Sequence, residues 1–137
     1  MAGNRTAHAV NAGVSVATAS AAKTFSNCIF WGNCGTEGEG SSNFEVTGTG
    51  TAPSIKNCCW PEATEDGGCT NGDPKLRTVK RYRYYPSPTG SCYETGDATG
   101  WTDADVDLAG NPRLRGEKVD IGCYQILPLP GLMLMLK

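Results

Sequence analysis

The sequence predicts an all-β, loop-rich domain built from a repeated strand-and-turn unit. The 137 residues include 18 glycines and 8 prolines, which favour turns and interrupt helices. A short β-prone segment, FSNCIFW at residues 25–31, is echoed thirty positions later by IKNCCW at residues 55–60. An Asn-Cys pair and a nearby tryptophan recur in both copies. A chain of this length has room for one hydrophobic core, so we expect a single domain.

The first half of the chain predicts strands separated by polar, glycine-rich turns. Residues 14–18 precede the first copy of the repeat, and residues 43–47 fall between the two copies. One flat coil of strands and turns cannot bury its inward face alone, so coils are expected to stack at the strand spacing of about 4.8 Å. In such a stack, each repeated asparagine hydrogen-bonds to its copy, and each repeated cysteine fills a narrow interior slot.

The second half predicts a segment that caps the stack. Its expected parts are a turn at 73–74, an alternating basic and aromatic segment at 76–85, a break at 86–90, an acidic loop at 94–107, a turn between short strands at 107–114, and a closing strand at 119–124. Val119, Ile121 and Cys123 share one face of that closing strand. A cap of this kind covers the unpaired backbone groups of the last coil.

Several motifs resemble the C-terminal end of right-handed parallel β-helix proteins, the pectin-lyase-like solenoids of bacterial secreted and surface proteins. They are NCIFWGN at 27–33, GDPKL at 72–76, SCYETGD at 91–97, DLAGNPR at 107–113 and VDIGCYQ at 119–125. Cys123 stands where such tails usually carry Ala, and Gln125 where they often carry Glu. The resemblance implies an all-β, right-handed parallel β-helix of few coils with a C-terminal β-hairpin cap. It divides the chain into coils (1–72), a terminal coil and capping segment (73–125) and an apolar tail (126–137).

The same resemblance implies an extracellular or cell-surface location and a chain that is a fragment of a longer protein. The expected function is a structural or adhesive module that binds a polysaccharide or cell-surface glycan. The alternative is a non-catalytic C-terminal remnant of a polysaccharide lyase or glycoside hydrolase, and no catalytic residue is assigned. A third class is a small disulfide-rich secreted protein without a solenoid. Exposed coil ends would favour self-association.

Charge and hydropathy exclude two classes of partner. The chain has 12 basic and 14 acidic residues, a net charge of −2, so it lacks the footprint of a dedicated nucleic-acid binder. The apolar stretch 126–136 is too short for a membrane span, which needs about 20 residues, and it contains Pro128 and Pro130. Residues 9–22 are small, but polar interruptions leave no convincing signal peptide.

A basic and aromatic run is the candidate binding site. It consists of Lys80, Arg81, Tyr82, Arg83 and Tyr84. Its cations would attract an acidic polysaccharide, and its rings would pack against sugars or cations. The alternative is a surface strand with one solvated face.

Carboxylates at alternate positions are the candidate metal site. Asp103, Asp105 and Asp107 resemble the start of a calcium loop, because Ca²⁺ prefers several oxygen ligands. Leu108 occupies the place where that loop requires glycine, so a solvated acidic loop is the alternative. On the predicted hairpin, the carboxylates of Asp107 and Asp120 would instead pair with nearby arginines, Arg113 and Arg115.

Seven cysteines suit an oxidising compartment, and the odd number leaves at least one thiol unpaired. No C-x-x-C pair occurs and the single histidine, His8, lies far away in sequence, which argues against structural zinc. Disulfides among loop cysteines, such as Cys69 with Cys92, remain open at this point. The alternative is that Cys28, Cys58 and Cys123 are small buried hydrophobic residues.

Overall fold

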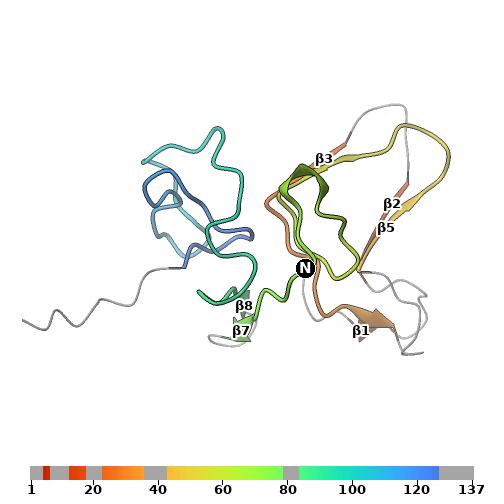
Figure 1. The fold of residues 1–137 in the computed structure, drawn as a ribbon, viewed down its shortest axis with the longest axis horizontal. Coiled ribbons are helices and arrows are strands. Elements are labelled where there is room, and N and C mark those ends of the chain that lie inside the picture. The colour runs from red at the N-terminus through yellow and green to blue at the C-terminus, as the bar shows by residue number, and fades with distance from the viewer. Residues whose placement is uncertain (1–4, 7–12, 18–22, 36–42, 79–83, 127–137) are drawn as a thin grey trace, which may run out of the picture.

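The computed structural model describes residues 5–6, 13–17, 23–35, 43–78 and 84–126. Within these ranges the chain forms short strands, one 3₁₀ turn and no α-helix, which confirms the all-β class (Figure 1). The elements are β1 (Arg5–Thr6), β2 (Val14–Ala17), β3 (Thr24–Ser26), β4 (Cys34–Gly35), β5 (Phe44–Thr47), β6 (Ser54–Lys56), η1 (Asp66–Gly68), β7 (Arg77–Thr78) and β8 (Tyr84–Tyr85). A search of the same residues finds no helix that is long and apolar enough to cross a membrane.

Segments thirty residues apart lie side by side as parallel neighbours. Strand β2 pairs with β5 from Val14 opposite Phe44 onward, and β3 pairs with β6 from Thr24 opposite Ser54 onward. Strands β1 and β4 are also parallel. Each of these sheets has two short strands. The parallel pairing of the two sequence copies is therefore confirmed.

A third layer follows the second copy of the repeat. The turn η1 returns the chain so that Gly67 accepts a hydrogen bond from the amide of Asn57 over 3.0 Å. The amide of Thr70 then donates to the carbonyl of Cys58 over 2.9 Å, and Thr70 forms a parallel bridge with Cys59. Because Cys59 also forms a parallel bridge with Ile29, three segments of the chain lie one above another at this point. The paired strands and these three segments, all among the described residues between 13 and 71, are called the stack below.

Two hydrophobic clusters lie on opposite sides of the repeated segment. In the first, the rings of Phe25, Phe30 and Phe44 pack with centroids 4.9 to 6.1 Å apart, and Trp60 adds a fourth ring 5.7 Å from Phe44. The second contains Cys59, Cys92 and Ile121, with Ile29 and Trp31 packed against it. Adjacent side chains along one extended segment point to opposite faces, so Phe30 enters the first cluster and Ile29 the second.

The repeated asparagines do not bond to each other, so that prediction is wrong. Both have left-handed backbone conformations, with φ of 53° at Asn27 and 47° at Asn57, a region that asparagine adopts more readily than most residues. The Asn27 amide donates to the carbonyl of Asp97 over 2.8 Å and accepts from the Asp97 amide over 2.7 Å. Asn57 donates to the carbonyl of Thr95 over 3.0 Å. The stacked asparagines thus hold one loop of the second half.

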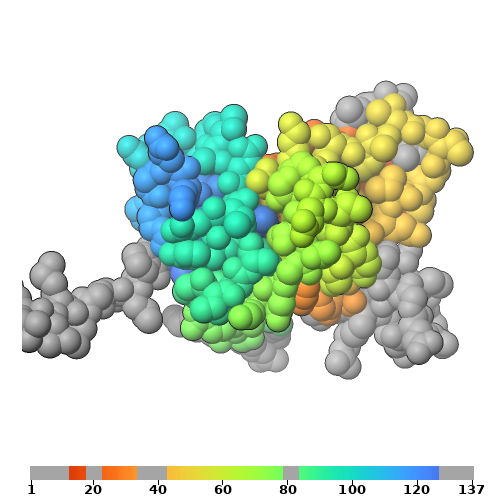
Figure 2. Space-filling model, viewed as in Figure 1, coloured from red at the N-terminus to blue at the C-terminus, as the bar shows by residue number. Residues whose placement is uncertain are grey.

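The second half is made of turns instead of the predicted closing strand and hairpin. Residues 105–126 contain only isolated antiparallel bridges, between Val106 and Pro112 and between Arg115 and Lys118. Asp120 is fully buried like its neighbours, and Gly122 has φ of 112°, so the alternating extended backbone expected there is not formed. The antiparallel hairpin that does form is β7–β8. This half packs against the stack (Figure 2).

Candidate functional site

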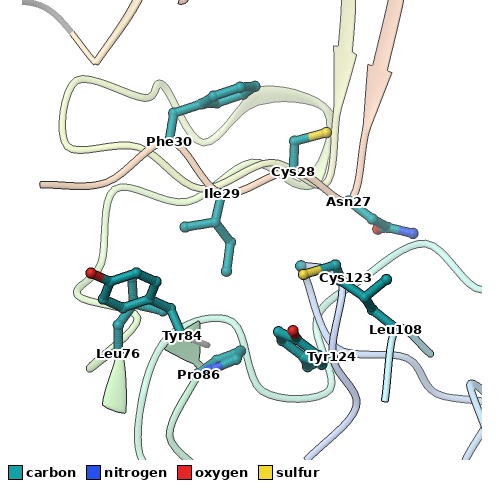
Figure 3. A pocket seen from close by; sticks show the side chains of 11 residues that line it. Asn27, Cys28, Ile29, Phe30, Leu76, Tyr84, Pro86, Leu108, Cys123 and Tyr124 are labelled. Atoms are coloured by element: carbon teal, nitrogen blue, oxygen red, sulfur yellow. The ribbon is translucent and has the colours of Figure 1, made fainter. Parts of the chain in front are cut away.

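The candidate site is a pocket of about 370 Å³ where the stack meets the second half of the chain (Figure 3). Three parts of the chain line it: the segment after β3, the β7–β8 hairpin with its flanks, and the turns near the end of the described chain. The lining residues are Asn27, Cys28, Ile29, Phe30, Leu76, Tyr84, Pro86, Leu108, Gly122, Cys123 and Tyr124. This volume lies within the usual range of small-ligand pockets.

Apolar side chains give the pocket its chemical character. Ile29 points towards Pro86 and Tyr124, whereas Phe30 and Cys28 point away on the other side of the same segment (Figure 3). No side chain of the lining set carries a formal positive charge or a carboxylate. The pocket therefore suits an apolar group, with the tyrosine hydroxyls and the exposed thiol of Cys123 as its polar features.

Glycine at position 122 allows the turn to approach the stack closely. The amide of Gly122 donates to the carbonyl of Asn27 over 2.9 Å. A methyl group added at Gly122 would lie 3.0 Å from Cδ1 of Ile29, and the positive φ of this residue already disfavours other amino acids. Tyr124 follows at once, and its ring stacks on Tyr85 of β8 with centroids 4.1 Å apart. These contacts join the hairpin, the turn and the stack around the pocket.

The basic and aromatic run is only partly described. Tyr84 lies in β8, is 40% exposed and lines the pocket. Lys80, Arg81, Tyr82 and Arg83 lie outside the described residues. The antiparallel register places Arg77 opposite Tyr85 and Thr78 opposite Tyr84, and both β7 side chains are exposed. The hairpin thus brings Arg77, which belongs to the same basic and aromatic stretch of sequence, beside the tyrosines.

Two of the three predicted calcium ligands, Asp105 and Asp107, accept hydrogen bonds from residues of the turns in which they lie. The buried carboxylate of Asp107 accepts hydrogen bonds from the amides of Ala109, Asn111 and Gln125 over 2.8 to 2.9 Å, and from the Asn111 side chain over 3.1 Å. Asp105 accepts from the amide and hydroxyl of Thr102, while Asp103 is exposed. Across the ranges given above, no three His, Cys, Asp or Glu side chains are grouped to hold a metal ion. The calcium site stays a prediction.

The contacts of Asp107 predict a pH dependence. Burial acts to raise the pKa of this carboxyl, but the hydrogen bonds from Gln125 and Asn111 outweigh it and leave the pKa below 3.8. A carboxyl with a lowered folded-state pKa stabilises the fold above its unfolded value, and that contribution is lost as pH falls through the folded pKa. We expect urea unfolding between pH 5 and pH 2 to show this loss.

The variant Asp107→Asn separates this contribution from those of other carboxyls. An amide nitrogen in place of one oxygen leaves donors without an acceptor, so the variant should be less stable by about 1–3 kcal/mol at pH 7. The difference between variant and wild type should shrink as the pH falls below 4. A difference that is constant from pH 7 to pH 2 would show that Asp107 does not titrate as described.

The arginines find partners other than those predicted. Arg113 is 3% exposed, and its Nη2 donates to the backbone carbonyl of Asp120 over 2.8 Å and not to a carboxylate. Arg115 forms its ion pair with Glu94, which also pairs with Lys118 over 2.8 Å. Lys118 and burial act in opposite directions on Glu94, and the ion pairs prevail and lower its pKa. Sequence reasoning missed Glu94, because only its sequence-distant partners give it this role.

The six cysteines whose side chains are described are free thiols. Cys58, Cys59, Cys69 and Cys92 are buried, Cys28 is half-buried and Cys123 is exposed. The expectation of a buried small residue is therefore correct for Cys58 and wrong for Cys123. The suggested partners Cys69 and Cys92 are not brought together: the thiol of Cys92 contacts Cys59, and the thiol of Cys69 faces the carbonyl of Ile55 at 3.8 Å.

Comparison of the chain with family models, curated proteins and solved structures finds no match. The contacts described above are therefore the basis for a functional proposal. They offer an apolar pocket, an exposed basic and aromatic hairpin at its rim, and a stack that this second half of the chain covers.

Proposed function

We propose that the chain is a structural and adhesive module of a secreted or surface protein, formed by the final coils of a right-handed parallel β-helix, and that it binds acidic polysaccharide. The observation that supports the architecture is the parallel register at a separation of thirty residues, which recurs in β2–β5 and β3–β6. Crossover connections between parallel strands of one sheet are right-handed in nearly all proteins. Successive coils of such a helix place equivalent residues one above another.

The β7–β8 hairpin is the proposed binding face. Exposed Arg77 and Tyr84 lie on adjacent strands, and Lys75 just before them is also exposed. The sequence between the strands adds Lys80, Arg81 and Arg83. Clustered cations attract the carboxylates of an acidic polysaccharide, and an exposed tyrosine ring offers a flat apolar surface to a sugar. The acidic polymer is therefore preferred over a neutral one.

Calorimetric titration with polygalacturonate and with neutral dextran tests this proposal. We expect binding to polygalacturonate alone, with an affinity that falls as salt is added because the interaction is largely electrostatic. The double variant Arg81→Gln/Arg83→Gln should weaken binding by about tenfold or more. On the scale of 1.4 kcal/mol per tenfold, that is the loss of two modest charge contacts.

A variant of equal charge change provides the control. Lys23→Gln/Lys56→Gln removes two exposed cations near β3 and β6, away from the hairpin. It should leave most of the affinity intact. Equal losses in both double variants would show that only net charge matters, and absence of binding to polygalacturonate would refute the glycan part of the proposal.

A further inference from the structure

Cys28 and Cys58 form a pair of thiols at equivalent positions of the stack. The backbone is in register on both sides of them, with Ser26 opposite Lys56 and Ile29 opposite Cys59. Each thiol reaches the carbonyl two residues before it over 3.2 Å, and both side chains belong to the first hydrophobic cluster. Neighbouring strands lie about 4.8 Å apart, within the Cα separation of about 4.4–6.8 Å that a disulfide spans.

A second pair links the stack to the other half of the chain. Cys59 and Cys92 are both fully buried, and they pack in the same hydrophobic cluster. The Ser91 hydroxyl lies 3.8 Å from the sulfur of Cys59 and 4.0 Å from that of Cys92. The carbonyl of Cys92 accepts a hydrogen bond from Ile121 over 2.9 Å, and the amide of Cys59 donates to Cys28 over 2.8 Å. Backbone hydrogen bonds therefore anchor both partners.

We propose that this protein carries two disulfides, Cys28–Cys58 and Cys59–Cys92, when it folds in the presence of a low-molecular-weight disulfide such as oxidised glutathione. The first cross-links two layers of the stack, and the second cross-links the stack to the segment that covers it. This proposal does not depend on polysaccharide binding.

Each bond forms by two thiol exchanges that balance in electrons and protons. One cysteine thiolate attacks a sulfur of oxidised glutathione, which breaks that S–S bond and releases one glutathione thiolate. The partner thiol, once deprotonated, attacks the mixed disulfide and releases the second glutathione. In total, two protein thiols are oxidised and one glutathione disulfide is reduced to two thiols.

The hydrogen bonds within each pair favour one cysteine as the first nucleophile. Cys58 donates to the thiolate of Cys28, which lowers the pKa of Cys28 and raises that of Cys58. The contact with Cys92 likewise lowers the pKa of Cys59 and raises that of Cys92. A thiolate, not a thiol, attacks a disulfide, and Cys28 is half-buried whereas Cys58 is buried, so Cys28 should react first in its pair.

Thiol counting after refolding tests the proposal. The reduced, denatured full chain is refolded with a mixture of reduced and oxidised glutathione, desalted, and titrated with Ellman's reagent in denaturant. Two disulfides use four of the seven cysteines, so three free thiols are expected, against seven in the fully reduced chain. Cys28→Ser should leave four, because Cys58 loses its partner. Seven free thiols in the refolded wild type would overturn the proposal.

Cys69→Ser and Cys123→Ser are the controls for alternative pairing. Each should leave two free thiols if its cysteine is unpaired, and four if its removal strands a partner. A count of four for Cys69→Ser would reject the assignment in favour of a bond to Cys69.

Tryptic mapping of the refolded protein shows which parts of the chain the bonds join. Cleavage after Lys23, Lys56, Lys75, Arg83 and Arg113 places Cys28 in peptide 24–56, Cys58 and Cys59 in peptide 57–75, and Cys92 in peptide 84–113. The two disulfides should join these into one three-peptide species that separates on reduction. In Cys92→Ser, peptides 24–56 and 57–75 should stay linked while 84–113 is released. A bond confined within peptide 57–75 would contradict the assignment.

Discussion

Replacing Asp120 with alanine is expected to lower the free energy of unfolding by about 3–5 kcal/mol, because the change leaves two amides without their acceptor and removes a negative charge near a buried guanidinium. The Asp120 carboxylate is fully buried and accepts hydrogen bonds from the amides of Glu94 over 2.7 Å and Ile126 over 2.6 Å. Its negative charge also interacts favourably with the positive charge of buried Arg113. Without the carboxylate, two amides lose their acceptor, while Arg113 keeps its hydrogen bond to the backbone carbonyl of residue 120 and loses only the nearby negative charge.

Urea unfolding followed by tryptophan fluorescence measures this effect. Asp103→Ala is the matched control, since it removes an exposed carboxylate of the same type and should change stability by no more than about 0.5 kcal/mol. If both variants unfold at the same urea concentration, the buried network does not stabilise the fold.

The Asp120→Asn variant adds a second test. Burial raises the pKa of Asp120 despite the hydrogen bonds to its carboxylate. A raised folded-state pKa means that this carboxyl stabilises the fold less as pH rises through that value, the opposite sense to Asp107. Asparagine keeps one oxygen acceptor without the charge, so its loss of stability at pH 7 should be clearly smaller than that of alanine.

Replacing Asn27 with alanine is expected to lower the free energy of unfolding by about 2–4 kcal/mol. The variant loses both hydrogen bonds between the Asn27 side chain and the backbone of Asp97. The backbone amide and carbonyl of Asp97 are then left without those partners. Alanine also tolerates the left-handed backbone at this position, φ of 53°, less well than asparagine does. The two effects add because they act in the same direction.

Two variants separate these causes. Asn27→Gly keeps the backbone conformation accessible and removes only the side-chain hydrogen bonds, so it should be the milder change. Asn57→Ala has the same backbone cost, since φ is 47° there, but loses a single hydrogen bond, to Thr95, and should destabilise the protein by about 1–2 kcal/mol. Hydrogen exchange at the Asp97 amide should accelerate in Asn27→Ala alone. Unchanged exchange there would mean that the asparagine does not hold the loop.

The repeat was predictable because the same residue types recur at a fixed spacing in the sequence. Asn27, Cys28 and a following aromatic residue reappear thirty positions later, and the strands around them pair in that register. Parallel neighbours in this register share the same environment at equivalent positions, so the sequence pattern and the pairing have one physical cause. The all-β class followed from the same pattern together with the glycine and proline content.

The second half was less predictable because its contacts join residues far apart in sequence. Nothing near Asn27 indicates that its partner is Asp97, and nothing near Arg115 indicates Glu94. The closing strand was predicted from alternation at 119–124, yet a fully buried Asp120 occupies the face expected to be solvated. Its burial depends on amides of Glu94 and Ile126, which no local pattern reveals.

The candidate site was also predictable only in part, where local sequence determines it. Of the predicted binding residues within the described chain, Tyr84 lines the pocket, and its exposure follows from the alternation of a short strand. The pocket itself is assembled from three separate segments, so no run of sequence predicts it. Cysteine content suggested cross-links, but the pairing Cys28 with Cys58 became visible only from the register of β3 and β6.

The loop held by Asn27 has a consequence for biosynthesis. Asn27 leaves the ribosome seventy residues before its partner Asp97, a delay on the order of several seconds at about 5–20 residues per second. During that interval the second half of the chain does not cover the paired strands, and their apolar Ile29 side is open to chaperones or to another emerging chain. Translation speed between these two codons should therefore influence the yield of folded protein.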